Sequence, residues 1–281
     1  MTAVGYALVG GSGNAAERVR HASRAEEAGF TFALLTESAG AVDAERDDPP
    51  PYVWSVLGAI AQATVSLRVG TIVDAPATAD AAELVAQAAT TAQTLMPGRF
   101  FLGLSSDGPA DGAAPESLET AVSIIRERWR ADAPTEEPGG LEIGATRIHA
   151  LPEPLPPIYL AAGDAAMAAR AARFGDGLIG TGGPSAVVGS FAAAGGRGPR
   201  IGRVAICWAP TKRRSRHVAG DGAVACGPDP ERHLTAIAAC LEAGYDHVYL
   251  EQIGPDQAGF LRFAEGELLP ALELETLRIA S

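Results

Sequence analysis

Apolar residues occur along this chain in short runs of strand length, and the segments between them have helical spacing. The runs show little apolar–polar alternation, which is typical of parallel strands in a sheet that is covered on both faces. The second and third runs stop at polar residues, Thr36 and Asp74. The predicted strands are Val4–Val9, Phe30–Leu35, Leu67–Val73, Phe100–Leu104, Ile158–Ala162, Gly177–Gly180, Arg203–Trp208 and His247–Glu251.

Helical segments follow these strands in regular order. They are predicted at Ala15–Ala28, Tyr52–Ala63, Ala79–Leu95, Pro115–Ala131, Asp164–Phe174, Ser185–Ala194, Pro230–Ala243 and Gln257–Leu277, the last one broken or ended near Pro270. Eight strands that alternate with helices over ~250 residues are the count of a (β/α)8 or TIM barrel. We therefore expect one α/β domain spanning residues 1–281, in which the Pro- and Gly-rich stretch 132–157 is an insertion with a small hairpin at Leu141–Ile148.

A dinucleotide-binding fold is the competing prediction for the first part of the chain. Gly11, Gly13 and Ala16 lie between a strand and a helix with the spacing of the dinucleotide fingerprint. Glu37 follows at the end of the second strand, where such folds place the acid that binds the ribose. The number of strands favours the barrel, because an open sheet of that kind more often has six strands.

Ligands of parallel α/β folds bind at the carboxyl ends of the strands, which makes Glu37, Ser38 and Asp74 candidate site residues. The net charge of −12 argues against a nucleic-acid or anionic-membrane surface. The three cysteines have no metal-type spacing and fit free thiols in a reducing compartment. No signal peptide precedes the first strand and no apolar run reaches ~18 residues, so we expect a cytoplasmic protein without a membrane partner.

Several blocks of the sequence resemble the luciferase-like, flavin-dependent monooxygenase superfamily. They are AEEAGFTFALL, PYVWSVLGAIAQATVSLRVGTIV, LVAQAATTAQTLMPGRFFLGL, PPIYLAAGDAAMAARAARFGDGLI and AGYDHVYLEQIGPDQAGFLRFAEGELLPAL. The branch that they resemble most is that of the F420-dependent oxidoreductases of the glucose-6-phosphate dehydrogenase type. The resemblance implies a (β/α)8 barrel with shortened insertions at its C-terminal mouth, coenzyme F420 (or FMN) in that mouth, and hydride transfer to or from a small organic substrate.

The resemblance also implies roles for particular residues. Glu37 and Ser38 occupy the catalytic position after the second strand. The positions that would contact the cofactor are Ile72, Val73, Asp74, Ser105, Ser106, Gly163, Asp164 and Ala165. Glu251 ends the last strand at a further candidate position, and the basic run 212–217 is a candidate for the phosphate or the acidic tail of F420. A solvated loop is the alternative interpretation of that run.

The same positions support a second hypothesis. Ser38 stands where the family usually has a histidine, and a serine is not a general base unaided. The Asn-Glu pair that follows the fourth strand in the family is missing here, and segments after the fourth and seventh strands are short. The alternative is a redox-inactive member: a cofactor-free enzyme, a ligand-binding protein, or the non-catalytic subunit of a heteromeric oxidoreductase. Relatives commonly dimerise next to the second and third strands, and the apolar segment Tyr52–Ala63 predicts a homodimer.

Overall fold

The computed structural model describes residues 3–8, 14–36, 51–106, 115–130, 151–181, 184–212 and 225–279. Within these residues nine strands form one sheet, in which β1, β2, β3, β4, β5, β6, β7 and β9 are joined in a closed ring by parallel pairs. The strands are β1 (Ala3–Ala7), β2 (Phe32–Thr36), β3 (Arg68–Asp74), β4 (Phe100–Ser105), β5 (Ile158–Ala162), β6 (Gly177–Gly180), β7 (Arg200–Cys207), β8 (Ala225–Cys226) and β9 (His247–Gln252). The short strand β8 adds to the end of β7.

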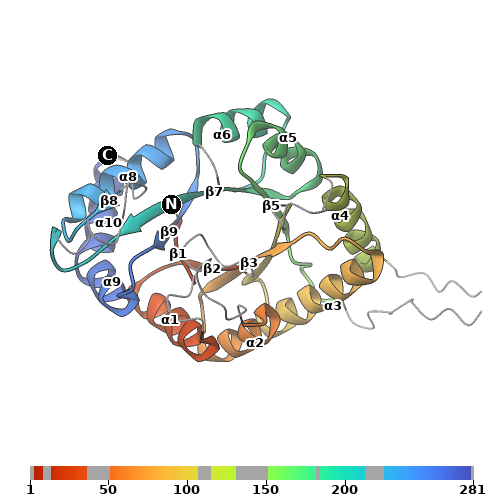
Figure 1. The fold of residues 1–281 in the computed structure, drawn as a ribbon, viewed down its shortest axis with the longest axis horizontal. Helices are drawn as coiled ribbons and strands as arrows, with labels where there is room; N and C mark the ends of the chain where they lie inside the picture. Colours follow the sequence, from red (N-terminus) through yellow and green to blue (C-terminus); the bar gives the residue numbers. More distant parts are fainter. Residues whose placement is uncertain are drawn as a thin grey trace, which may run out of the picture.

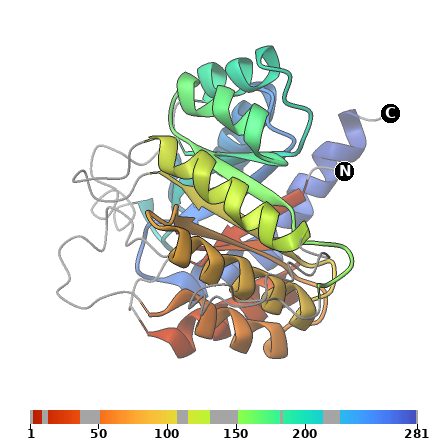
Figure 2. The ribbon, with the colours of Figure 1, turned by 90° about the vertical axis from the view of Figure 1, so that its right-hand side faces the viewer.

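Helices surround this ring on the outside, as Figure 1 shows along the barrel. They are α1 (Ala15–Ala28), α2 (Val53–Ala63), α3 (Ala79–Leu95), α4 (Pro115–Arg130), α5 (Ala165–Phe174), α6 (Pro184–Ala193), α8 (Pro230–Glu242), α9 (Gln257–Phe263), the π-helix η1 (Ala264–Leu268) and α10 (Leu269–Ile279). Strand β1 begins and α10 ends on the same side of the barrel (Figure 2). The opposite side is the C-terminal mouth, where parallel strands end.

The barrel interior is filled by aromatic rings that lie over glycines. A Cβ at Gly5 would overlap the ring of Phe32, and a Cβ at Gly70 would overlap the ring of Phe101. Phe101 packs against Tyr159 with ring centroids 5.0 Å apart, and against Phe32 at 6.4 Å. Only glycine leaves the volume that these rings occupy, so the glycines inside the apolar strands are part of the packing.

The closed ring confirms the predicted (β/α)8 barrel, and the competing dinucleotide-binding prediction is wrong. All eight predicted strands are present, and α1 and α3 have the predicted bounds. Strand β7, however, begins at Arg200 rather than Arg203, and the two-residue β8 was not predicted. The last helix continues through Pro270, and η1 provides the irregular turn just before it, because proline lacks the N–H that a regular helix needs. The predicted hairpin at Leu141–Ile148 lies outside the described residues.

Candidate functional site

The side chains that point into the barrel alternate along each strand. Their phase is fixed by an apolar interior cluster that includes Leu34, Ile179 and Tyr249. Toward the C-terminal end, the parallel register and this alternation place further positions inward in successive layers. These are Ala7, Ile72, Ala161 and Arg203, then Thr36, Ser105, Thr181 and Glu251, and finally Asp74, Gly163 and Ala205. The mouth is therefore a polar ring on a floor of small and apolar side chains.

Arg203 and Glu251 form an ion pair between β7 and β9 inside this mouth. Arg203 Nε donates to Glu251 Oε2, and the arginine side chain is 40% exposed whereas that of Glu251 is 12% exposed. Burial by itself lowers the pKa of the Arg203 guanidinium, but the hydrogen bond and the negative charge of Glu251 raise it above its ordinary value. Sequence reasoning suggested Glu251 and missed Arg203, a charged residue at an inward position of a mostly buried strand.

The predicted cofactor positions on β3 and β4 divide according to the face on which they lie. Ile72 and Asp74 are inward, and Asp74 lies directly beside Ser105 in the register. Val73 faces the helices and is 2% exposed, so its side chain does not reach the mouth. Ser106 also turns away, because its hydroxyl lies 3.7 Å from the sulfur of Met167 on α5. The structure thus brings Ile72, Asp74 and Ser105 together at the mouth.

The other predicted cofactor positions lie where β5 leads into α5: Gly163 and Asp164 are in the loop, Ala165 is the first residue of α5, and all three are exposed. Asp164 is the N-cap of α5, and its Oδ1 accepts a hydrogen bond of 2.8 Å from the backbone N–H of Met167. A carboxylate thus already occupies the helix N-terminus that would otherwise attract a phosphate.

The two predicted catalytic residues, Glu37 and Ser38, lie outside the described residues. Thr36 immediately precedes them as the last residue of β2, and its carbonyl accepts a hydrogen bond of 3.2 Å from Arg18 Nη1. The N-cap of α3 is Thr78, whose hydroxyl accepts from the N–H of Ala81 at 3.3 Å, so Asp74 does not cap this helix. Of the basic run 212–217, the described part contains Lys212 alone.

Glutamine side chains fix the rim of the mouth at the end of β9. The side-chain amide of Gln252 makes two hydrogen bonds with the backbone of Trp208. Gln252 Oε1 accepts from the Trp208 N–H at 2.8 Å, and Gln252 Nε2 donates to the Trp208 carbonyl at 2.9 Å. Gln257 donates to the carbonyls of Gln252 at 2.8 Å and Gly254 at 2.7 Å, and it accepts from the Tyr6 hydroxyl. These contacts explain the block EQIGPDQAGF, since they hold the end of β9 next to β7 and thereby position the inward residues of both strands.

Two cysteines meet at the end of β7. Cys207 and Cys226 are direct partners in the β7–β8 register, with Cys207 buried and Cys226 partly exposed. Burial, together with the neighbouring Cys226 thiol, raises the pKa of Cys207 to about 11. Cys207 is 0% exposed and belongs to the core.

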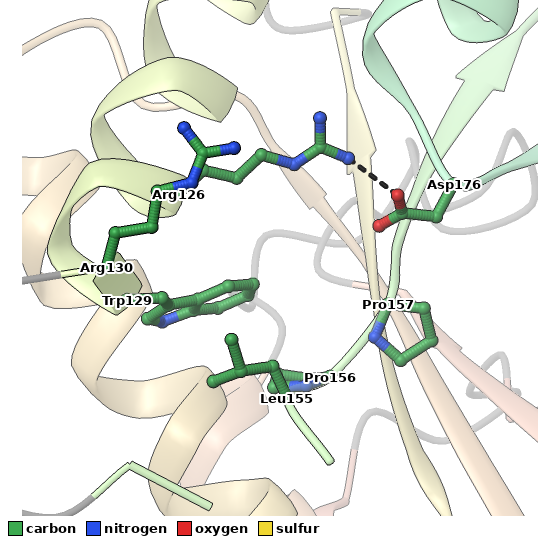
Figure 3. A pocket seen from close by; sticks show the side chains of 7 residues that line it. All are labelled: Arg126, Trp129, Arg130, Leu155, Pro156, Pro157 and Asp176. Atoms are coloured by element: carbon green, nitrogen blue, oxygen red, sulfur yellow. Dashed lines mark hydrogen bonds and ion pairs between the residues drawn. The ribbon is translucent and has the colours of Figure 1, made fainter. Parts of the chain in front are cut away.

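Other features of the described residues lie away from the mouth. A pocket of ≈ 320 Å³ beside the Arg126–Asp176 ion pair is lined by Trp129 and by residues 155–157 just before β5, at the N-terminal end of the barrel (Figure 3).

No group of His, Cys, Asp or Glu side chains in the described ranges could hold a metal ion. Among the same residues, no helix is long and apolar enough to cross a membrane.

The fold and the mouth define a (β/α)8 barrel whose candidate site lies at the ends of the strands. Residues 1–195 match the model of the luciferase-like monooxygenase family, and the chain belongs to this family. It is 32% identical over 146 residues to an F420-dependent glucose-6-phosphate dehydrogenase of Mycobacterium avium (strain 104), covering 47% of this chain and 44% of the relative. It is 29% identical over 195 residues to the enzyme of that name from Amycolatopsis mediterranei (strain U-32), covering 65% of this chain and 58% of the relative. The matched part therefore spans about half the length of these relatives.

A solved structure of an F420-dependent secondary alcohol dehydrogenase, in complex with an F420-acetone adduct, has the same fold. The TM-score is 0.82 at 18% sequence identity, and the similarity covers 96% of this chain and 99% of that one.

Proposed function

We propose that this protein is an oxidoreductase that transfers a hydride between coenzyme F420 and a small organic substrate, with FMN as the alternative cofactor. The observation that carries the proposal is the polar ring on an apolar floor at the C-terminal mouth, in a chain whose named relatives are F420-dependent. When bound, the cofactor would supply the hydride-carrying ring. Glu37 and Ser38, which follow directly after the mouth residue Thr36, are the proposed catalytic residues on the grounds of their sequence position.

The described residues of the mouth fit a flat heteroaromatic ring. Ala7, Ile72 and Ala161 are the apolar inward residues at the base of the mouth, and such rings gain most of their affinity from apolar burial. Above them, the inward hydroxyls of Thr36 and Ser105 are suited to the carbonyl and N–H groups at the edge of the ring. Asp164 does not fit a phosphate at the start of α5, so we expect the phosphate to be held elsewhere.

The second hypothesis is a redox-inactive family member. It is favoured by Ser38 in place of the family histidine and by the carboxylate of Asp164 that caps α5. A mouth of this kind would still bind a small molecule, but without a cofactor to exchange a hydride. The two hypotheses therefore differ in cofactor binding, which can be measured directly.

Titration of the purified protein with F420 and with FMN, followed by fluorescence quenching, tests the proposal. We expect saturable binding of one of the two below ~100 μM, which corresponds to roughly −5.5 kcal/mol. Binding of neither would remove the oxidoreductase proposal and leave the redox-inactive hypothesis. Glu37→Gln should then lower activity while the melting temperature stays nearly unchanged, whereas a large loss of stability without a functional change would make Glu37 structural.

We also propose that the protein forms a homodimer through α2 and α3. An open groove of ≈ 320 Å³ runs between these helices, and three large side chains on it are strongly exposed: Tyr52 at 66%, Leu84 at 64% and Leu95 at 44%. Exposed apolar patches of this kind are typical of association surfaces. Size-exclusion chromatography with light scattering should give the mass of a dimer, and Leu84→Glu should shift it to that of a monomer. A wild-type monomer would contradict the proposal.

A further inference from the structure

The guanidinium of Arg203 is the one strongly exposed cation among the inward positions that form the described part of the mouth. It lies in the same layer as the floor residues Ala7, Ile72 and Ala161, one layer below Glu251. The other three side chains of this layer are small or apolar, so Arg203 is its charged member. A ligand that rests on this floor would therefore lie next to a positive charge.

The hydrogen bonds of Arg203 leave part of its guanidinium free for a ligand. Nε is bound to Glu251, and within the described ranges neither Nη atom has a hydrogen-bond partner. A guanidinium held at one edge presents its remaining donors in a fixed plane, which is the geometry that carboxylates and phosphates bind with two parallel hydrogen bonds. Glu251 is mostly buried, so it fixes the direction of the arginine rather than competing for the ligand in solvent.

We propose that Arg203 is a specificity-determining residue that binds a phosphate or carboxylate group of a ligand in the mouth, and that Glu251 is its positioning residue. The inference rests on the proposed function in one respect only, because it places the anion in the same mouth as the cofactor. Asp164 already caps α5, so the start of that helix is a poor site for such a group. The anionic group belongs either to the cofactor or to the substrate, and the two sources can be separated experimentally.

Calorimetric titration of the full chain with inorganic phosphate tests the anion site itself. We expect Arg203→Gln to weaken phosphate binding at least tenfold, which is about 1.4 kcal/mol, and Arg203→Lys to retain part of it because one positive charge remains. Arg200→Gln is the matched control: Arg200 lies on the same strand and pairs with Asp246, but at the N-terminal end. It should leave phosphate binding unchanged. Equal phosphate affinity in the wild type and Arg203→Gln, or no phosphate binding by the wild type, would overturn the proposal.

Glu251→Gln tests the positioning role. It should weaken phosphate binding several-fold while the affinity for riboflavin, which lacks a phosphate, stays the same. An equal loss for both probes would show that Glu251 only supports the structure. If Arg203→Gln does not fold, Arg203→Lys keeps the pairing with Glu251 and carries the test.

The source of the anion follows from two further titrations. If Arg203 binds the cofactor, the preference for FMN over riboflavin should disappear in Arg203→Gln. If it binds the substrate, that preference should remain, and phosphate should bind to the cofactor-loaded wild type. A chain that binds phosphate through Arg203 but neither F420 nor FMN would refute the proposed function and leave this inference standing. Binding of F420 or FMN, with equal phosphate affinity in the wild type and Arg203→Gln, would support the proposed function and refute this inference.

Discussion

Substitution of Gly70 by alanine tests whether the barrel interior depends on glycines under aromatic rings. A Cβ at this position would lie 2.7 Å from Cδ2 of Phe101 and closer still to two other carbons of that ring. Phe101 is 1% exposed and is packed against Tyr159 and Phe32, so the ring has no open space into which it can move. Overpacking of this kind costs about 1–3 kcal/mol. At roughly 2–4 °C per kcal/mol for a chain of this size, Tm should fall by about 2–12 °C.

Differential scanning calorimetry or fluorimetry of the wild type and Gly70→Ala gives the shift. Gly189→Ala is the control, because Gly189 lies within α6 and a Cβ there meets nothing within 4 Å. This control should raise the unfolding free energy by about 0.4–1 kcal/mol, since alanine reduces the entropy of the unfolded chain. An unchanged or higher Tm in Gly70→Ala would refute the packing argument. Adding Phe101→Leu should recover part of the loss if the two positions share one volume.

Three further predictions follow from single contacts. Burial by itself raises the pKa of the Glu26 carboxyl, but hydrogen bonds from the N–H groups of residues 65–67 together hold it below its ordinary value. The stabilisation by Glu26 is therefore present above the unfolded-state pKa and lost as pH falls through the folded-state pKa. In urea titrations, the difference in unfolding free energy between the wild type and Glu26→Gln should become smaller as the solution is made acidic. Among the three thiols, Cys226 should react first with N-ethylmaleimide in native mass spectrometry, because burial raises the pKa of both Cys207 and Cys240 to about 11; equal rates for all three would contradict this. Gln257→Leu should lower the unfolding free energy by about 1–3 kcal/mol in denaturant titration, because a buried tyrosine hydroxyl and two carbonyls lose their partner; an unchanged midpoint would show that water replaces the amide.

The barrel could be predicted because apolar runs and helical spacing are local signals that repeat along the chain. The mouth could be predicted only where the phase of a strand was certain. Arg203 shows the reason. The sequence predicts it as the first residue of its strand, which would place it at the N-terminal edge of the barrel, at the end opposite the expected ligand site. The actual strand begins three residues earlier, at Arg200, because Ile201 and Gly202 are buried in the ladder with β9. A glycine in the pattern concealed this start, since it contributes no apolar side chain to the run.

Asp164 shows a second limit of the sequence. The pattern placed it at the start of a helix, which is correct, and the family resemblance placed it at a cofactor site. Which of these descriptions applies depends on the direction of one carboxylate. In the structure that carboxylate accepts from the N–H of Met167, so the residue completes the helix. Spacing in the sequence gives the position of such a group but not its hydrogen-bond partner.

Two arginine–carboxylate pairs join β7 to the β9 region, and their difference bears on what the mouth does. Asp246 accepts from the backbone N–H of Arg200 at 2.8 Å, from its Nε at 3.2 Å and contacts His247 Nδ1 at 2.5 Å, so it holds several parts of the N-terminal end together. Glu251, in the described part of the chain, has Arg203 as its hydrogen-bond partner and no other. A mostly buried carboxylate with a single partner adds little net stability, because its desolvation offsets the attraction. The effect of Glu251 is to fix the guanidinium of Arg203 at the mouth, and this is expected if the guanidinium binds a ligand.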